Sequence, residues 1–163
     1  MSIRIIEFSP EYTGVTVAIW NEIVEEGVAF PQLDYLDVEN GKAFFEEQSF
    51  TGLAFDEDSQ RIIGLYILHP NNVGRCGHIA NASYAVASSY RGMGVGEVLV
   101  THCLGKAKEL GFKIMQFNAV VANNQRALKL YKKLGFELLG TIPKGFLLKD
   151  GRYEDITVHY KVL

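Results

Sequence analysis

The stretch "SSYRGMGVGEVLV", residues 88–100, places an arginine and three alternating glycines directly before an apolar run. An extended segment, residues 78–87, comes before it, and the apolar residues after it keep helical spacing as far as Gly111. This order predicts a strand, a tight turn and a helix. The first amides of a helix have no partner within the helix and carry partial positive charge, so the turn predicts a site for a small anion.

The three glycines suit such a site because a glycine carries no side chain that would keep an anion from the backbone, and because it tolerates positive φ. Arg91 adds a permanent positive charge suited to phosphate. The dinucleotide pattern GxGxxG fails, since Glu97 stands at its last glycine, and the phosphate-loop pattern GxxxxGK[ST] is absent. On this stretch alone, a plain strand-to-helix turn remains an open alternative.

Composition predicts a single globular domain, residues 1–163, with 48% hydrophobic and 21% charged residues. A net charge of −3 argues against a nucleic-acid partner, which would need a basic face. The two cysteines lack CxxC spacing and the four histidines are scattered, so neither a disulfide framework nor a metal site is expected. The amino-terminal "MSIRIIEFSP" lacks the apolar core of a signal peptide, and no apolar run predicts membrane contact. A cytoplasmic protein is the resulting expectation.

Periodicity along the chain predicts an α/β fold (α+β) with a largely antiparallel sheet. Helical spacing covers residues 13–26, roughly 36–48, 94–110 and 123–134. Extended patterns cover residues 2–8, 50–56, 61–69, 78–87 and 112–120, followed by a β-rich end. Asp150-Gly151 predicts a hairpin in that end. The centre of the chain therefore reads strand, helix, strand, helix.

Two patterns in the right order resemble those of the GNAT (GCN5-related) N-acetyltransferases. Residues 91–96 fit the family pattern R/Q-x-x-G-x-G/A, and Val86 stands where the family's preceding strand has its valine. The stretch "VVANNQRALKLYKKLGFELLG", residues 120–140, is similar to the second pattern, V-x-x-x-N-x-x-A-x-x-L-Y-x-x-x-G-F. It fits at Val120, Asn124, Ala127, Leu130, Tyr131, Gly135 and Phe136. The closing hairpin loosely resembles phosphinothricin-type acetyltransferases.

The resemblance implies a mixed, mostly antiparallel sheet of about seven strands flanked by about four helices, with two central parallel strands that splay apart. It also implies that the cosubstrate acetyl-CoA lies in that opening and that no metal takes part. Backbone groups of Tyr84, Ala85 and Val86 would pair with the pantetheine amides and the thioester oxygen. The pyrophosphate would lie on the turn formed by Arg91, Gly92, Met93, Gly94, Val95 and Gly96.

Asn124, with Ala127 in the same pattern, would contact the pantetheine arm, although an N-cap role for Asn124 stays open. The implied reaction is direct transfer of the acetyl group to an amine. Tyr131 corresponds to the tyrosine that protonates the coenzyme A sulfur. A small-molecule primary amine, such as an amino acid or its analogue, is the expected acceptor. A protein amino terminus or lysine, and a catalytically silent acetyl-CoA-binding module, stay open. The resemblance also implies a homodimer.

The general base is not determined by the sequence, because Asn81 and Ala80 stand where several relatives carry a glutamate. Three sources stay open: His78 on the strand face of Ala80, Glu25 or Glu26 at the end of the first helix, or water with Asn81 positioning the amine. In this family the segment between the first two helices covers the acceptor site. In this chain that segment contains the aromatic residue Phe30. The predicted acceptor-side residues are Glu26, Phe30, His78 and Asn81.

Overall fold

The computed structural model describes all 163 residues, arranged as one sheet with helices on both faces. The helices are α1 (Thr13–Glu26), α2 (Val38–Glu46), α3 (Val95–Glu109) and α4 (Gln125–Lys133). The strands are β1 (Ile3–Glu7), β2 (Phe50–Asp56), β3 (Arg61–Pro70), β4 (Ile79–Val86), β5 (Ile114–Val121), β6 (Glu137–Leu147) and β7 (Tyr153–Val162). The elements thus follow the order that the sequence predicts.

The sheet has seven strands in the order β1-β2-β3-β4-β5-β7-β6. Every neighbouring pair is antiparallel except β4 and β5, which are parallel. The connection from β4 to β5 passes through α3, as a parallel pair requires. The predicted fold class, a mostly antiparallel mixed sheet with four helices, is therefore confirmed.

The parallel pair is short and opens early. β4 and β5 pair only at Ile79 with Ile114 and at Ala80 with Met115. Beyond these rungs β4 continues to pair with β3 as far as Val86, so its edge toward β5 keeps unpaired backbone groups. The strands therefore enclose an opening near the centre of the sheet.

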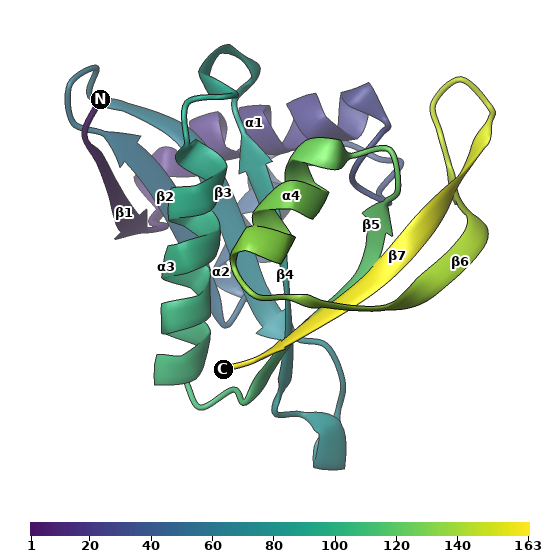
Figure 1. The fold of residues 1–163 in the computed structure, drawn as a ribbon. Helices are drawn as coiled ribbons and strands as arrows, with labels where there is room; N and C mark the ends of the chain where they lie inside the picture. Colours follow the sequence, from purple (N-terminus) through teal and green to yellow (C-terminus); the bar gives the residue numbers. More distant parts are fainter.

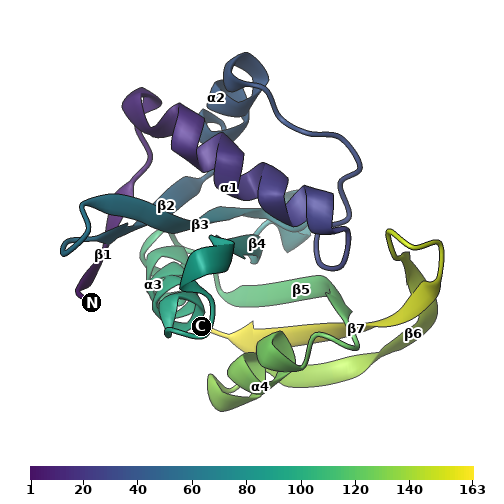
Figure 2. The ribbon, with the colours of Figure 1, turned by 90° about the horizontal axis from the view of Figure 1, so that it is seen from above.

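Helices α1 and α2 cover one face of the sheet, and α3 and α4 cover the other (Figures 1 and 2). Trp20 and Phe45 are buried in the core under α1 and α2, whereas Leu99 and Cys103 are buried in the core under α3. Alternation along β4 separates the two cores, because Ala85 belongs to the first and Ala82 to the second. One face of β4 thus packs against α1 and the other against α3.

The second helix is shorter than its predicted range, residues 36–48. Asn21 of α1 donates from Nδ2 to the carbonyl of Leu36 and accepts from the Leu36 amide, at 2.8 and 2.9 Å. Those contacts hold Leu36 outside the helix. Asp37 then caps α2, since its side chain accepts from the Asn40 amide at 2.8 Å while Asn40 accepts from the Asp37 amide at 2.7 Å.

None of the helices is both long and apolar enough to cross a lipid bilayer.

Candidate functional site

A pocket of about 210 Å³ lies where β4 and β5 separate. Three segments besides β4 contribute to its wall: the loop after α1, strand β5 and helix α4. The pocket is lined by Ala29, Phe30, Pro31, Asn81, Ala82, Ser83, Tyr84, Phe117, Asn118, Ala119, Val120, Val121, Asn124, Ala127 and Tyr131. Strand β4, which leads into the first sequence pattern, therefore meets Asn124, Ala127 and Tyr131 of the second pattern at one cavity, while residues 91–96 lie outside its lining.

No aspartate, glutamate, histidine, lysine or arginine lines this pocket. Its polar side chains are amides and hydroxyls: Asn81, Ser83, Tyr84, Asn118, Asn124 and Tyr131. At neutral pH a side-chain amide is neither protonated nor deprotonated, and the hydroxyls of serine and tyrosine remain protonated. The pocket wall therefore offers hydrogen-bond donors and acceptors but no ordinary general base.

Tyr131 stands on α4 among aromatic rings. Its ring centroid lies 4.6 Å from that of Phe117, 5.5 Å from that of Phe136 and 6.3 Å from that of His159. Burial raises the pKa of Tyr131 above its ordinary value. The phenol therefore stays protonated at neutral pH and is available as a general acid.

Tyr84 contributes a fully buried hydroxyl that has no hydrogen-bond partner. Burial raises the pKa of Tyr84 well above its ordinary value, so the group stays a neutral donor. The Cys103 thiol of α3 is its neighbour, but a thiol is a weak acceptor and the pair does not reach hydrogen-bonding geometry. One donor at the base of the opening is thus left without an acceptor from the protein.

The turn between β4 and α3 takes the shape that its glycines permit. Gly92 has φ 78° and Gly94 has φ 84°, both in the left-handed region. Gly94 precedes α3 and offers no side-chain cap, and the first amide bonded back into the helix is that of Val98, which donates to the Gly94 carbonyl at 3.3 Å. The amides before it, in Val95, Gly96 and Glu97, are the free donors of a helix start.

The space above this turn is open. A Cβ atom at Gly94 would have no atom within 4 Å outside its neighbours in the chain. At Gly92 the nearest atom is a guanidinium nitrogen of Arg126 at 4.0 Å, and at Gly96 it is a methyl carbon of Leu130 at 3.8 Å. A side chain would occupy room that a bound anion could use. Glu97, the one acid in the first turn of α3, pairs with Lys133 of α4 at 2.8 Å, which offsets its charge. The turn therefore fits a phosphate group.

Arg91 does not present a free guanidinium to this space. Its Nη1 donates to Oε2 of Glu26 at 2.9 Å, and its Nη2 donates to Oε1 of the same carboxylate. Its Nε donates to the Val86 carbonyl at 3.4 Å. The Glu26 carboxylate raises the pKa of Arg91 still further. Arg91 and Glu26 are thus engaged with each other rather than with the pocket.

The predicted acceptor-side residues divide into two groups. Phe30 and Asn81 line the pocket. Phe30 is fixed there by packing on Trp20, with ring centroids 4.5 Å apart. Glu26 and His78 lie outside the pocket lining, and His78 precedes β4 at the end remote from the glycine turn. Glu25, the other acid considered at this helix end, is also outside and pairs with Lys149 at 2.8 Å.

Asn81 stands where the two strands part. Its Nδ2 donates to the Gln116 carbonyl of β5 at 2.9 Å, immediately after the last rung of the parallel pair. The side chain therefore closes the bottom of the opening.

Asn124 caps α4, because its side chain accepts from the Ala127 amide at 3.2 Å. The N-cap role left open by the sequence is thus present, and the same residue also lines the pocket.

The sequence interpretation missed the polar residues of β5. Gln116 Nε2 donates to Oδ1 of Asn118 at 2.9 Å, and Asn118 Nδ2 donates to Oδ1 of Asn71 at 2.6 Å. Asn118 lines the pocket. The signal was present in the sequence, since Gln116 and Asn118 alternate with buried Met115 and Phe117, as expected for a strand with one polar face.

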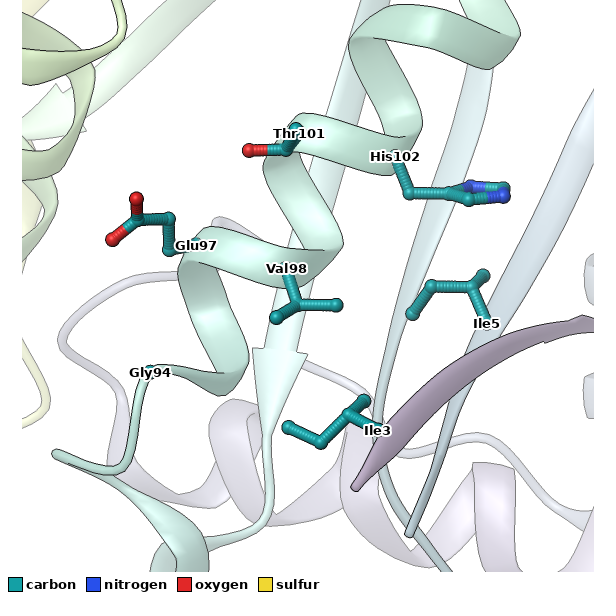
Figure 3. A pocket seen from close by; sticks show the side chains of 7 residues that line it. All are labelled: Ile3, Ile5, Gly94, Glu97, Val98, Thr101 and His102. Atoms are coloured by element: carbon teal, nitrogen blue, oxygen red, sulfur yellow. The ribbon is translucent and has the colours of Figure 1, made fainter. Parts of the chain in front are cut away.

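A second, larger pocket of about 550 Å³ lies between β1 and α3 (Figure 3). It is lined by Ile3, Ile5, Gly94, Glu97, Val98, Thr101 and His102, and it shares no residue with the pocket at the strand opening. The Nδ1 of His102 is engaged with the Tyr66 hydroxyl at 2.9 Å. Glu97 and His102 both line this pocket but point away from each other (Figure 3), and Glu97 pairs with Lys133 of α4. The candidate site for the chemistry is the smaller pocket, because it lies at the strand opening and is lined by Tyr131.

The sheet that opens between parallel strands, with a glycine turn at its edge and a tyrosine-bearing helix beside it, corresponds to the family expected from the two sequence patterns. The model of the Acetyltransferase (GNAT) family matches residues 16–136. The chain therefore belongs to the acetyltransferase (GNAT) family.

Individual known proteins are also similar to all or part of this chain. The "GCN5-Related N-Acetyltransferase from Kribbella flavida" is 30% identical in sequence, with a TM-score of 0.90 over 99% of this chain and 98% of that one. "N-acetyltransferase aca1" of Schizosaccharomyces pombe is 36% identical over 88 residues, or 54% of this chain and 42% of that protein. The "L-methionine sulfoximine/L-methionine sulfone acetyltransferase" of Pseudomonas aeruginosa is 27% identical over 150 residues, or 88% of this chain and 78% of that protein. The chain spans less than half the length of the first curated relatives it matches.

Proposed function

We propose that this chain is an acetyl-CoA-dependent N-acetyltransferase that moves an acetyl group directly to the primary amine of a small molecule, such as an amino acid or its analogue. The observation that carries the proposal is the opening between β4 and β5, which brings the unpaired edge of β4 and Tyr131 of α4 to one pocket, while β4 leads directly into the glycine turn at the start of α3. Family membership and the similarity to an acetyltransferase of amino-acid analogues support it.

We also propose that residues 1–163 act as a single domain. Strands from both ends of the chain, β1 and β7, belong to the same sheet. The helices on its two faces bury two large cores against that sheet. Neither half of the chain would keep these cores covered without the other.

The donor substrate supplies an activated acetyl group as a thioester. In the proposed complex, amides of the turn from Arg91 to Gly96 bind its pyrophosphate. Unpaired backbone groups of Tyr84, Ala85 and Val86 bind the pantetheine amides, as an added strand would. An amide of the same strand edge stabilises negative charge on the thioester oxygen. The chain alone thus provides positioning and charge stabilisation.

Two groups change charge during the reaction, the attacking amine nitrogen and the leaving sulfur, and each requires a proton transfer. The amine nitrogen attacks the acetyl carbon, a C–N bond forms and the C–S bond breaks. The leaving sulfur takes the proton of the Tyr131 hydroxyl, the attacking nitrogen releases its own proton to water, and the Tyr131 oxygen then regains a proton from water. Because the pocket wall carries no ionisable base, we propose that the acceptor amine is deprotonated by water before it reacts. Asn81 would position that amine through Oδ1, since its Nδ2 is committed to Gln116.

The acceptor pocket also limits what the amine can carry. Phe30 and Pro31 form part of its wall and no charged side chain lines it, so the part of the acceptor inside the pocket is expected to be small and uncharged. Such a wall favours a compact molecule over a basic peptide.

A thiol-release assay tests the proposal. The protein is incubated with acetyl-CoA and, separately, with amino acids, methionine sulfoximine, alkyl amines and basic peptides, and free coenzyme A thiol is measured. We expect release with at least one small amine and none with peptides. Release with peptides alone would overturn the acceptor class. A raised melting temperature with acetyl-CoA but no release with any acceptor would indicate a silent binding module.

A homodimer in the cytoplasm completes the proposal. Strand β6 forms one edge of the sheet and leaves large apolar side chains exposed, among them Leu138, Leu139, Ile142 and Leu147. An uncovered edge of this kind suits pairing with a second copy. Both cysteines are free, as suits a reducing compartment. Size-exclusion chromatography with light scattering measures the oligomeric state, and a monomer at all protein concentrations would exclude the dimer.

A further inference from the structure

We infer that Glu26 of α1 is a positioning residue for the donor turn. It holds the Arg91 guanidinium against α1, so that the turn binds the donor's phosphates through its backbone amides and not through Arg91. The inference rests on the proposed function. It assigns a role to a residue 65 positions away from Arg91 in the sequence.

Two carboxylates of α1 hold the segment that joins β4 to α3. Glu26 engages both terminal nitrogens of Arg91, one of them at 2.9 Å. Glu22, one turn earlier on the same helix, accepts from the Ser88 amide at 3.0 Å. The two contacts therefore fix both ends of residues 88–91, immediately before the first glycine.

The geometry of Arg91 leaves it little freedom. A guanidinium has its donors in a rigid fork, which a carboxylate matches with two parallel hydrogen bonds. The third edge, Nε, faces the Val86 carbonyl at the end of β4. About 30% of the Arg91 side chain and 33% of the Glu26 side chain remain exposed, so separating them would leave two partly buried charges unpaired.

The same contact reaches the acceptor side. Glu26 is the last residue of α1, and Gly27 at φ 63° turns the chain into the loop that carries Phe30. The donor turn and that wall of the acceptor pocket are consequently attached to one ion pair.

Two roles for Arg91 predict opposite effects of the change Glu26→Gln. If Arg91 bound phosphate directly, removing the carboxylate would release the guanidinium and remove a negative charge near the anion, and affinity would rise. If Glu26 positions the turn, the same change loosens residues 88–91 and affinity falls. Arg91→Lys also distinguishes the two roles. Lysine binds phosphate as a point charge, so affinity would be kept if Arg91 bound phosphate directly. It lacks the fork that matches Glu26, so affinity falls if the contact between the two residues positions the turn.

The experiment measures coenzyme A affinity by isothermal titration for Glu26→Gln, Arg91→Lys and the double variant. We expect each single change to weaken binding by about tenfold, the effect of one charge-assisted hydrogen bond, and the double change to add little. Glu46→Gln is the matched control, since it breaks a 3.1 Å ion pair with Lys42 on α2, away from the turn. Its affinity should equal that of the wild type.

Two further readouts identify positioning. The KM for acetyl-CoA should rise in Glu26→Gln while kcat stays near that of the wild type, because Tyr131 is unaffected. Without ligand, the amides of Tyr90 and Arg91, which donate to the Ala87 and Ser88 carbonyls, should exchange hydrogen faster in Glu26→Gln. Unchanged or tighter binding by Glu26→Gln overturns the inference alone. A wild type that does not bind coenzyme A overturns the proposed function and the inference with it.

Discussion

Replacing Tyr131 by phenylalanine is expected to lower kcat by about 100-fold, the usual size of a lost general acid, with the affinity for acetyl-CoA unchanged. The change removes one oxygen and keeps the ring that packs on Phe117 and Phe136. Transfer then releases an unprotonated thiolate into a partly apolar site, which raises the barrier to C–S cleavage. Steady-state kinetics with saturating acceptor and a titration with coenzyme A measure the two quantities.

Tyr160→Phe is the matched control for this change. The Tyr160 hydroxyl donates to Glu137 at 2.8 Å, on the β6–β7 hairpin and outside the pocket, so its loss should leave kcat unaltered. Equal rates for wild type and Tyr131→Phe would remove the assigned role of the phenol.

The pH dependence of the reaction rate gives a related prediction. Burial favours the neutral phenol and raises the pKa of Tyr131, so the donor stays protonated beyond pH 10, the usual range for tyrosine. The rate should therefore rise with pH as the acceptor amine loses its proton, and no falling limb from Tyr131 should occur below about pH 10. A falling limb near neutrality that disappears in Tyr131→Phe would contradict this assignment.

The second large effect is expected at the glycine turn. Gly94→Val should weaken coenzyme A binding by about 100-fold or more, because the new side chain occupies the open space above the turn and displaces several amide–phosphate hydrogen bonds together. The variant also places a β-branched residue at φ 84°, which costs about 1–2 kcal/mol of folding free energy. Titration calorimetry and denaturant unfolding measure the two effects separately.

Gly111→Val separates backbone strain from site blockage. Gly111 has φ 95° after the end of α3, and a side chain there would also meet no atom within 4 Å. It should lose similar folding free energy while binding coenzyme A as the wild type does. If both variants lost affinity for coenzyme A equally, the effect of Gly94→Val would come from reduced stability. The assignment of the turn as the phosphate site would then be wrong.

The local parts of this fold were predictable because they depend on neighbours in sequence. The end of α1 at Gly27 and the turn from Gly92 to Gly96 follow from the backbone freedom of glycine. The extent of α2 was not, since its start depends on Asn21 reaching Leu36 across 15 positions. Periodicity contains no information about which distant side chain will bind a given backbone group.

The candidate site likewise has a part that could be predicted from the sequence and a part that could not. The meeting of Tyr84, Asn124 and Tyr131 at one cavity agrees with the two sequence patterns. The partner of Arg91 was not predictable, because an arginine beside a glycine turn suits phosphate and carboxylate equally well until the fold brings Glu26 to it. Asn81 likewise gained its role as the contact between β4 and β5 only from the tertiary structure.

The brief pairing of β4 with β5 has a mechanical consequence for the whole molecule. Four strands lie on one side of the break and three on the other. Two rungs, the Asn81–Gln116 hydrogen bond and the hydrogen bond from the Lys113 amide to the His78 carbonyl connect β4 with β5 across it. A ligand hydrogen-bonded to both β4 and β5 would continue the interrupted ladder and couple the four-stranded part of the sheet to the three-stranded part. Donor binding should then slow amide exchange as far away as the β6–β7 hairpin, so that the donor acts as a temporary part of the protein's own framework.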